Sequence, residues 1–172
     1  MSHIKYILPS LILLSKSLFA CGDNQNAIIH GPFKTKLFDE GTICFQRTID
    51  KRNIDFILNK PINDKLSDIV IERYSYSDGP VEILSVFYAP VKNESNIFVI
   101  LRWTVNYGVS PTYKYYYEVR AYERSGEKLI VNKLLRTDQK LSGYQMISSG
   151  FVSRYELDSA AKVREYIKQN YQ

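Results

Sequence analysis

The sequence is poor in the side chains from which most active sites are built. It has 2 histidines, 2 cysteines and 2 methionines among 172 residues. Histidine and cysteine are the usual ligands of zinc, and histidine is the commonest general acid or base. The chain also has no nucleophile elbow, no H-E-x-x-H pair and no glycine-rich phosphate or dinucleotide motif. We therefore expect no cofactor and no metal site.

Charge of one sign is not concentrated in any part of the chain. The sequence holds 23 lysines and arginines against 18 aspartates and glutamates, and its formal net charge is +5. Nucleic-acid-binding domains gather their basic residues into a run or onto one face. Here the basic residues alternate with acids along the chain, so we expect no nucleic-acid partner.

A pair of acidic residues could still support glycosidase chemistry, which needs only two carboxylates at a suitable separation. Glu118 and Glu123 lie on opposite faces of one predicted strand and therefore do not converge. Glu118 instead fits a cross-strand ion pair with a basic residue such as Arg102. We expect that the chain is not an enzyme.

The first 20 residues have the pattern of a secretory signal. Lys5 precedes the apolar run of residues 6–14, and Ala20 is the small residue that a signal peptidase requires. The run is shorter than the roughly 20 apolar residues of a transmembrane helix. We expect residues 1–20 to be removed and residues 21–172 to form one globular domain in the periplasm or outside the cell.

The two cysteines, Cys21 and Cys44, form an even pair, which in a secreted chain is most simply a disulfide. Residues 18–21 (LFAC) also approximate a lipobox, in which a lipid on Cys21 would anchor the protein to a membrane. The bulk of Phe19 and the polar pair at residues 16–17 favour ordinary cleavage. We expect a Cys21–Cys44 disulfide, and membrane attachment only if Cys21 is lipidated.

Residues 68–135 alternate between apolar and polar side chains with a period of two. In residues 97–105 every odd position is apolar, and residues 113–122 show the same alternation, which is typical of strands with one buried face. Turn-forming residues separate these runs and predict an antiparallel meander; the turns are residues 77–80, 107–112 and 124–127. Earlier in the chain the pattern predicts a hairpin over residues 34–38 and 41–48, a strand at 54–58 and a loop at 59–66.

The C-terminus changes to a helical period. Asp158 or Ser159 can cap a helix whose apolar stripe recurs every three or four residues; the stripe consists of Ala160, Val163, Ile167 and Tyr171. An antiparallel sheet with one apolar face needs a cover. The predicted fold is α+β, a mostly antiparallel β-meander sheet with the C-terminal helix packed on it.

Tyrosine is abundant, with 14 copies, and tyrosine and arginine are enriched where interfaces concentrate their binding energy. We expect the sheet face opposite Trp103 to be exposed and to bind a protein partner. The predicted site residues are Arg102, Tyr116, Glu118, Arg120 and Tyr122, beside a loop that contains Gly108 and Pro111. The alternatives are a merely solvated face and a face covered by the helix.

Several segments carry a resemblance to a known class of proteins: Arg102-Trp103, the aromatic run at residues 115–122, the Ser142-Gly143-Tyr144 turn and the helical residues 160–167. Together with the secretory signal, they resemble small periplasmic proteins of proteobacteria encoded beside secreted antibacterial effectors. The chain is similar to immunity proteins of the type VI secretion kind. The resemblance implies a stoichiometric inhibitor with one protein partner, a toxin. The alternative function is a carbohydrate-binding or cell-wall-binding module without catalysis, which would stack exposed aromatic rings on sugars.

Overall fold

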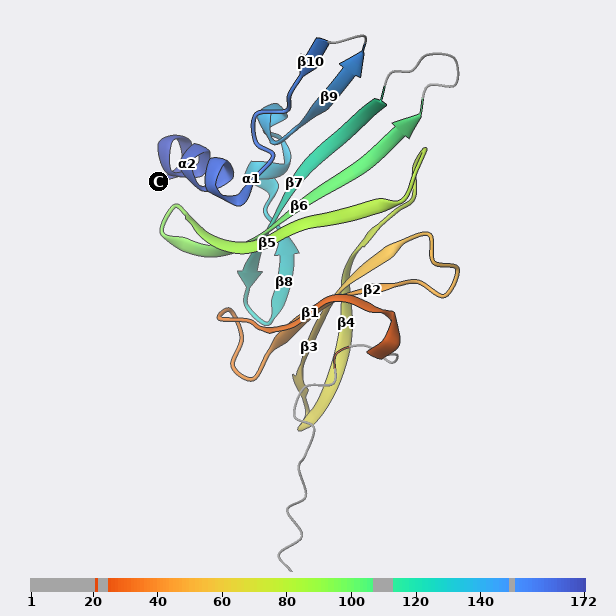
Figure 1. Cartoon of the computed structure of the whole chain (residues 1–172). Coiled ribbons are helices and arrows are strands. Elements are labelled where there is room, and N and C mark those ends of the chain that lie inside the picture. Colours follow the sequence, from red (N-terminus) through yellow and green to blue (C-terminus); the bar gives the residue numbers. More distant parts are fainter. Residues whose placement is uncertain (1–20, 22–24, 107–112, 149–150) are drawn as a thin grey trace, which may run out of the picture.

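In the computed structural model, two antiparallel sheets pack face to face and helices cover the outer side of the second sheet (Figure 1). The structure describes residues 21, 25–106, 113–148 and 151–172. The expected signal segment, residues 1–20, lies outside the described residues. The prediction of a mostly antiparallel β fold with a C-terminal helix is confirmed, but the single meander is wrong because the strands divide between two sheets.

The first sheet contains the N-terminal strands in the order β1-β2-β3-β4. These strands are β1 (Ile28–Lys34), β2 (Thr42–Arg47), β3 (Ile54–Ile62) and β4 (Lys65–Tyr74). The second sheet has the order β10-β9-β7-β6-β5, with β8 paired to β7 beside β9. Its strands are β5 (Val81–Val91), β6 (Glu94–Asn106), β7 (Tyr113–Ser125), β8 (Lys128–Val131), β9 (Ser142–Ser148) and β10 (Phe151–Ser153).

Residues 77–80, predicted as a hairpin turn, instead belong to a segment, residues 75–80, that carries the chain from one sheet to the other. β4 pairs with β3 and β5 pairs with β6, so the two strands flanking this segment are not partners. Gly79 packs against the second sheet so closely that a Cβ atom there would lie 2.7 Å from the backbone oxygen of Thr104. The turn-forming residues of this segment therefore connect two sheets. Turn-forming residues alone do not show whether the flanking strands pair as a hairpin or belong to different sheets.

β6 lies between β5 and β7 in the second sheet and is covered on both faces. Residues 97–101 are all fully buried. Val99 and Leu101 pack toward the first sheet, whereas Phe98 and Ile100 pack toward the helices. A strand buried on both faces has a nearly continuous hydrophobic sequence, which explains why polar residues enter the alternation only at Arg102.

The C-terminal helix α2 (Ala160–Tyr171) forms as the sequence predicts. Ser159 is its N-cap residue, and Val163 and Ile167 from the predicted stripe are buried. The helix packs beside β5, where the guanidinium of Arg164 lies 4.6 Å from the ring centre of Phe87. α2 thus covers the face of the second sheet that points away from the first sheet.

Asp138 fastens α2 to the segment after the short helix α1 (Lys133–Arg136). Its carboxylate caps the 3₁₀ turn at Gln139–Leu141 through the backbone N–H of Lys140, at 2.9 Å. The same carboxylate accepts hydrogen bonds from the hydroxyls of Tyr166, at 2.5 Å, and Tyr171, at 2.8 Å. Burial acts to raise the pKa of Asp138, but these hydrogen bonds hold it below its usual value.

We expect this lowered pKa to make stability depend on acid. A carboxylate whose pKa is lower in the folded state contributes stability above its unfolded pKa, about 3.9, and loses that contribution as the pH falls through the folded value. Asp138→Asn keeps an oxygen acceptor but does not titrate. Urea unfolding of both proteins between pH 7 and pH 2 should show a stability difference at neutral pH that shrinks below about pH 4. A difference that stays constant across this range would contradict the assignment.

The predicted disulfide is present between Cys21 and Cys44. Both cysteines are fully buried and pack with Ile57 and Ile28 on the outer face of the first sheet, away from the inter-sheet core. Because the lipid of a lipoprotein is attached through this same sulfur atom, the disulfide and lipidation of Cys21 exclude each other in one molecule.

Two segments of the first sheet differ from the sequence-based expectation. The predicted strand at residues 34–38 lies largely after β1, which begins at Ile28 and contains the Gly31-Pro32 step. Gly31 has a φ of +95°, and a Cβ atom there would lie 2.9 Å from the backbone oxygen of Ile43. The predicted loop at residues 59–66 is partly strand. Pro61 has no N–H to donate, but it lies beyond the last β2–β3 pair, where β3 forms no further hydrogen bonds with β2, so it is tolerated in β3.

Candidate binding site

A hollow with many polar side chains lies between the two sheets, where β4 ends. It has a volume of about 490 Å³ and is lined by the end of β4, the segment after it and strands of the second sheet. We call it the aromatic cleft. Its lining residues are Glu72, Arg73, Tyr74, Ser75, Tyr76, Ser77, Asp78, Trp103, Val105, Tyr116, Glu118, Arg120 and Tyr144.

Three aromatic rings from neighbouring strands form one side of the aromatic cleft. Strand pairing places Trp103 opposite Tyr116 and Tyr116 opposite Tyr144. The ring centres of Trp103 and Tyr116 are 6.0 Å apart, and those of Tyr116 and Tyr144 are 4.8 Å apart. Trp103 is buried and donates its indole N–H to the backbone oxygen of Ser75, whereas Tyr144 is 56% exposed. The aromatic side therefore extends from the core to solvent.

Arg120 holds two carboxylates together on the floor of the cleft. Its guanidinium lies 2.5 Å from Glu118 and 3.9 Å from Glu72. Arg136 of α1 approaches Glu72 at 3.5 Å from the outer side. The three side chains Arg120, Glu118 and Glu72 are each about one-fifth exposed. The Nε–H of Arg120 is buried and has no acceptor among the described residues.

Tyrosine hydroxyls complete this network. Tyr116 donates to Glu118 at 3.1 Å, and Tyr122 donates to Glu72 at 2.5 Å. The hydroxyls of Tyr74 and Tyr122 are 2.7 Å apart. Burial raises the pKa of both Tyr74 and Tyr122, so both hydroxyls keep their protons. The network links β4, β7 and α1, and it spans the boundary between the two sheets.

The structure brings only part of the predicted site together. Tyr116, Glu118 and Arg120 line the aromatic cleft. Tyr122 is fully buried in the inter-sheet core and is not exposed as expected. Arg102 lies on the opposite face of the second sheet. Gly108 and Pro111 lie outside the described residues.

The prediction of one exposed face was wrong because alternation within each strand does not define the register between β6 and β7. Asn106 pairs with Tyr113, so odd residues of β6 share a face with even residues of β7. Trp103 and Tyr116 therefore point the same way, toward the first sheet. Arg102 instead contacts Tyr115, at 4.7 Å from the ring centre, and forms an ion pair with Glu82 at 2.6 Å. The suggested ion pair between Arg102 and Glu118 is also wrong, because Glu118 pairs with Arg120.

Sequence reasoning missed the residues that the first sheet and α1 contribute. Glu72 and Tyr74 of the first sheet meet Arg120 and Tyr122 only through packing of the two sheets, and Arg136 of α1 contacts Glu72. The one available signal was a run of aromatic and charged residues at 72–76, just before the turn-forming residues 77–80.

The chemistry of the cleft suits binding. Glu72 and Glu118 are both held by Arg120 and by tyrosine hydroxyls. Within the described residues no group of three or more histidine, cysteine, aspartate or glutamate side chains could hold a metal ion. What the cleft offers is aromatic surface beside fixed charges of both signs.

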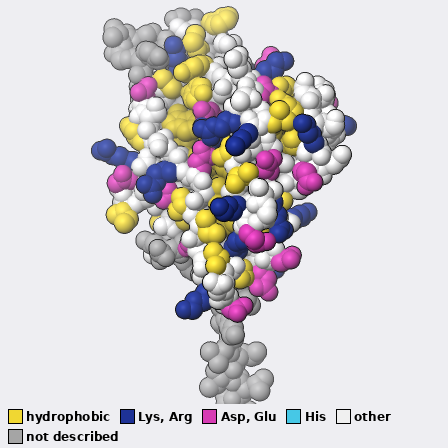
Figure 2. All heavy atoms as spheres, turned by 180° about the vertical axis from the view of Figure 1, so that it is seen from behind, with side chains coloured by type: hydrophobic (Ala, Val, Ile, Leu, Met, Phe, Trp, Pro, Cys, Tyr) yellow, Lys and Arg dark blue, Asp and Glu magenta, His cyan; other side chains and the backbone are white. Residues whose placement is uncertain are grey.

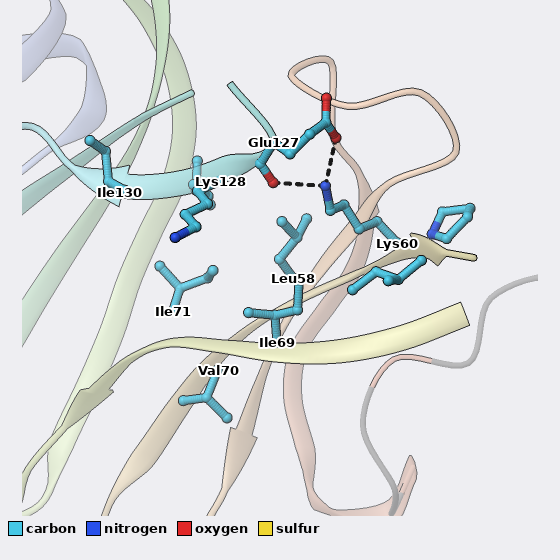
Figure 3. A pocket seen from close by; sticks show the side chains of 11 residues that line it. Leu58, Lys60, Ile69, Val70, Ile71, Glu127, Lys128 and Ile130 are labelled. Carbon is cyan, nitrogen blue, oxygen red and sulfur yellow. Dashed lines mark hydrogen bonds and ion pairs between the residues drawn. The ribbon is translucent and has the colours of Figure 1, made fainter. Parts of the chain in front are cut away.

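A second hollow, which we call the apolar groove, lies between β3, β4 and β8 (Figure 3). It has a volume of about 520 Å³ and is lined by Leu58, Lys60, Pro61, Ile62, Ile69, Val70, Ile71, Glu127, Lys128, Leu129 and Ile130. At one end Lys60, only 7% exposed, donates to the backbone oxygen of Glu127 at 2.7 Å and to its carboxylate at 2.9 Å. This contact neutralises Lys60 and ties the two sheets together.

The face of the molecule seen in Figure 2 shows no concentration of one charge. In Figure 2 lysines and arginines are interspersed with aspartates and glutamates, with hydrophobic side chains between them. None of the helices in the described part of the chain is long and apolar enough to cross a membrane. Comparison with protein-family models, curated proteins and solved structures finds no match to this chain.

Proposed function

We propose that the chain is a non-catalytic binding protein that takes a protein partner at the aromatic cleft. More specifically, we propose an immunity-type protein that acts in the periplasm and blocks a cognate antibacterial toxin. The observation that supports this most is the cleft itself, where the exposed ring of Tyr144 lies beside the fixed charges of Glu118 and Arg120. Aromatic and arginine side chains in partly desolvated hollows are typical of sites that dominate protein-protein affinity. The disulfide is consistent with an oxidising compartment.

The alternative, a carbohydrate-binding module, receives less support from the geometry. Sugar binding by stacking is favoured by aromatic rings that present an open, flat face. The ring planes of Trp103 and Tyr116 are inclined by 43°, and those of Tyr116 and Tyr144 by 46°. The three rings therefore form no common plane, and only Tyr144 is more than half exposed.

The test uses the protein encoded beside the gene for this chain as the candidate toxin. We expect the two purified proteins to form a stable complex, and the chain to restore growth when the toxin is directed to the periplasm. Tyr144→Ala should weaken the complex by about thirtyfold, the usual cost of removing an interfacial aromatic anchor. Phe33→Ala, which removes a 40% exposed ring from β1 in the other sheet, should not. Isothermal titration calorimetry measures both.

Two results would contradict this proposal. The first is absence of binding and of growth rescue with every gene neighbour that is toxic in the periplasm. The second is an affinity that falls equally in Tyr144→Ala and Phe33→Ala. Binding of peptidoglycan fragments that is lost in Tyr144→Ala would instead support the carbohydrate module.

A further inference from the structure

β4 has a free backbone edge. It is the last strand in the order of the first sheet, it is 10 residues long, and β3 is its one strand partner in the described part of the chain. β8 is likewise paired only with β7 among the described strands. Such edges present unpaired N–H and C=O groups that can pair with a further strand.

The apolar groove and the aromatic cleft follow this edge, one after the other. Ile69, Val70 and Ile71 line the apolar groove, and the residues that come next, from Glu72 to Asp78, line the aromatic cleft. Between the two hollows Glu72 contacts Arg120 and Arg136. One extended segment beside β4 would therefore contact both hollows.

The apolar groove has the composition of a site for an apolar segment with one acidic side chain. Leu58, Ile69 and Ile71 form its floor (Figure 3), and Val70 is 55% exposed on β4. The ammonium of Lys128 extends toward Ile71 in the same view. Lys60 is neutralised by Glu127, whereas Lys128 forms no ion pair with any residue that the structure describes. A carboxylate on the ligand would supply the missing counter-charge.

We propose that an extended segment of the protein partner pairs with the free edge of β4 as an added strand. It would place apolar side chains in the apolar groove, a carboxylate against Lys128 and its far end in the aromatic cleft. Strand addition derives its affinity from main-chain hydrogen bonds and its specificity from pockets for alternate side chains. This proposal rests on the proposed function, because it assigns the binding mode of the same protein partner.

An irregularity in β4 restricts which strands can pair there. The β3–β4 register shifts between the pairs Phe56–Glu72 and Ile57–Val70, which leaves Ile71 as the extra residue of a β-bulge. Bulges at sheet edges hinder indiscriminate pairing. The regular stretch before Ile71 borders the apolar groove, so a partner strand needs a matching side-chain pattern there.

The experiment selects ligands directly and does not require the toxin to be identified. A displayed library of random ten-residue peptides is panned against the disulfide-bonded protein, and the selected peptides are synthesised and measured by calorimetry. We expect sequences that alternate apolar residues and include an acid. Lys128→Glu should weaken their binding by about tenfold, because it replaces an attractive charge pair with a repulsive one. Lys133→Glu, the same charge change on an exposed lysine of α1 outside the groove, should have less than about a twofold effect.

Backbone methylation separates strand pairing from simple side-chain docking. Two versions of each selected peptide are made, one N-methylated at its odd residues and one at its even residues. In an added strand only one of the two sets faces β4, so one version should lose binding and the other should keep it. Binding that is lost or kept equally in both versions would overturn strand addition. The same conclusion would follow if Lys128→Glu left the affinity for the peptides unchanged, or if the library yielded no binder.

These outcomes are distinct from those of the functional test. If only one methylated version of each peptide binds but no neighbouring toxin is neutralised, strand addition at β4 is supported and the immunity function is contradicted. If a toxin is neutralised but both methylated versions of each peptide behave alike, the immunity function is supported and strand addition is contradicted.

Discussion

Tyr122→Ala is expected to lower the free energy of unfolding by about 3–5 kcal/mol, the usual cost of truncating a large buried aromatic side chain. The ring of Tyr122 is fully buried and meets Phe56 edge-on, with ring centres 4.9 Å apart. Its hydroxyl also joins Tyr74 to Glu72, so alanine leaves a cavity and removes both hydrogen bonds. Thermal and urea denaturation measure the effect, which corresponds to a fall of about 6–20 °C in melting temperature.

Two control variants identify the cause of this loss. Tyr122→Phe keeps the ring and removes only the hydroxyl, so it should cost about 1–3 kcal/mol through the unpaired partners left behind. Tyr144→Ala removes an exposed ring from the same sheet face and should change stability by about 0.5 kcal/mol or less. If Tyr122→Ala melted at the temperature of the unmodified protein, Tyr122 would lie on the surface, as the sequence alone suggested.

Removing the disulfide should cost about 3 kcal/mol in the chain-entropy account of cross-links. Cys21 and Cys44 are 23 residues apart in sequence, so the bond closes a loop of moderate length in the unfolded chain. The expected change in melting temperature for the double variant Cys21→Ala/Cys44→Ala is a fall of about 6–12 °C. Differential scanning calorimetry provides the measurement.

The matched control is chemical reduction. A reductant should lower the melting temperature of the unmodified protein and leave the double variant unaffected, since the variant has no bond to reduce. A mass increase of a diacylglyceryl group on Cys21, in protein recovered from membranes, would show that the sulfur is used for anchoring. An unchanged melting temperature in the double variant would show that the bond contributes nothing to the fold.

The sequence was sufficient to predict local structure wherever periodicity is the cause of that structure. The helix at Ala160–Tyr171 was predictable because its buried residues Val163 and Ile167 recur with helical spacing after a capping residue. The strands of the second sheet were predictable for the same kind of reason. The disulfide followed from the count of cysteines.

Properties that depend on pairing between strands were not predictable. Whether Arg102 or Trp103 shares a face with Tyr116 depends on the β6–β7 register, which alternation within one strand does not determine. The partners of Arg120 could not be predicted from the sequence for a related reason. Glu72 belongs to the other sheet, so its proximity to Arg120 is a product of tertiary packing.

The burial of Arg120 decides which residue best tests the cleft. An exposed strand residue can be replaced by alanine at little cost to the fold. Arg120, however, is only 20% exposed and lies beside Glu118 and Glu72, and removing it would leave Glu118 without its cation. Loss of partner binding in Arg120→Ala would therefore be mixed with loss of stability, which is why Tyr144 is the better residue for testing the cleft.

The change of sheet at residues 75–80 has a consequence for how the chain acquires its binding site. All strands of the first sheet precede this segment and all strands of the second follow it, so each sheet is assembled from one uninterrupted half of the chain. Pairings within each half are antiparallel and mostly between sequence neighbours, which favours rapid folding. The aromatic cleft, by contrast, takes Glu72 from one half and Arg120 from the other. Because its lining comes from both halves, the aromatic cleft is complete only when the two halves are docked.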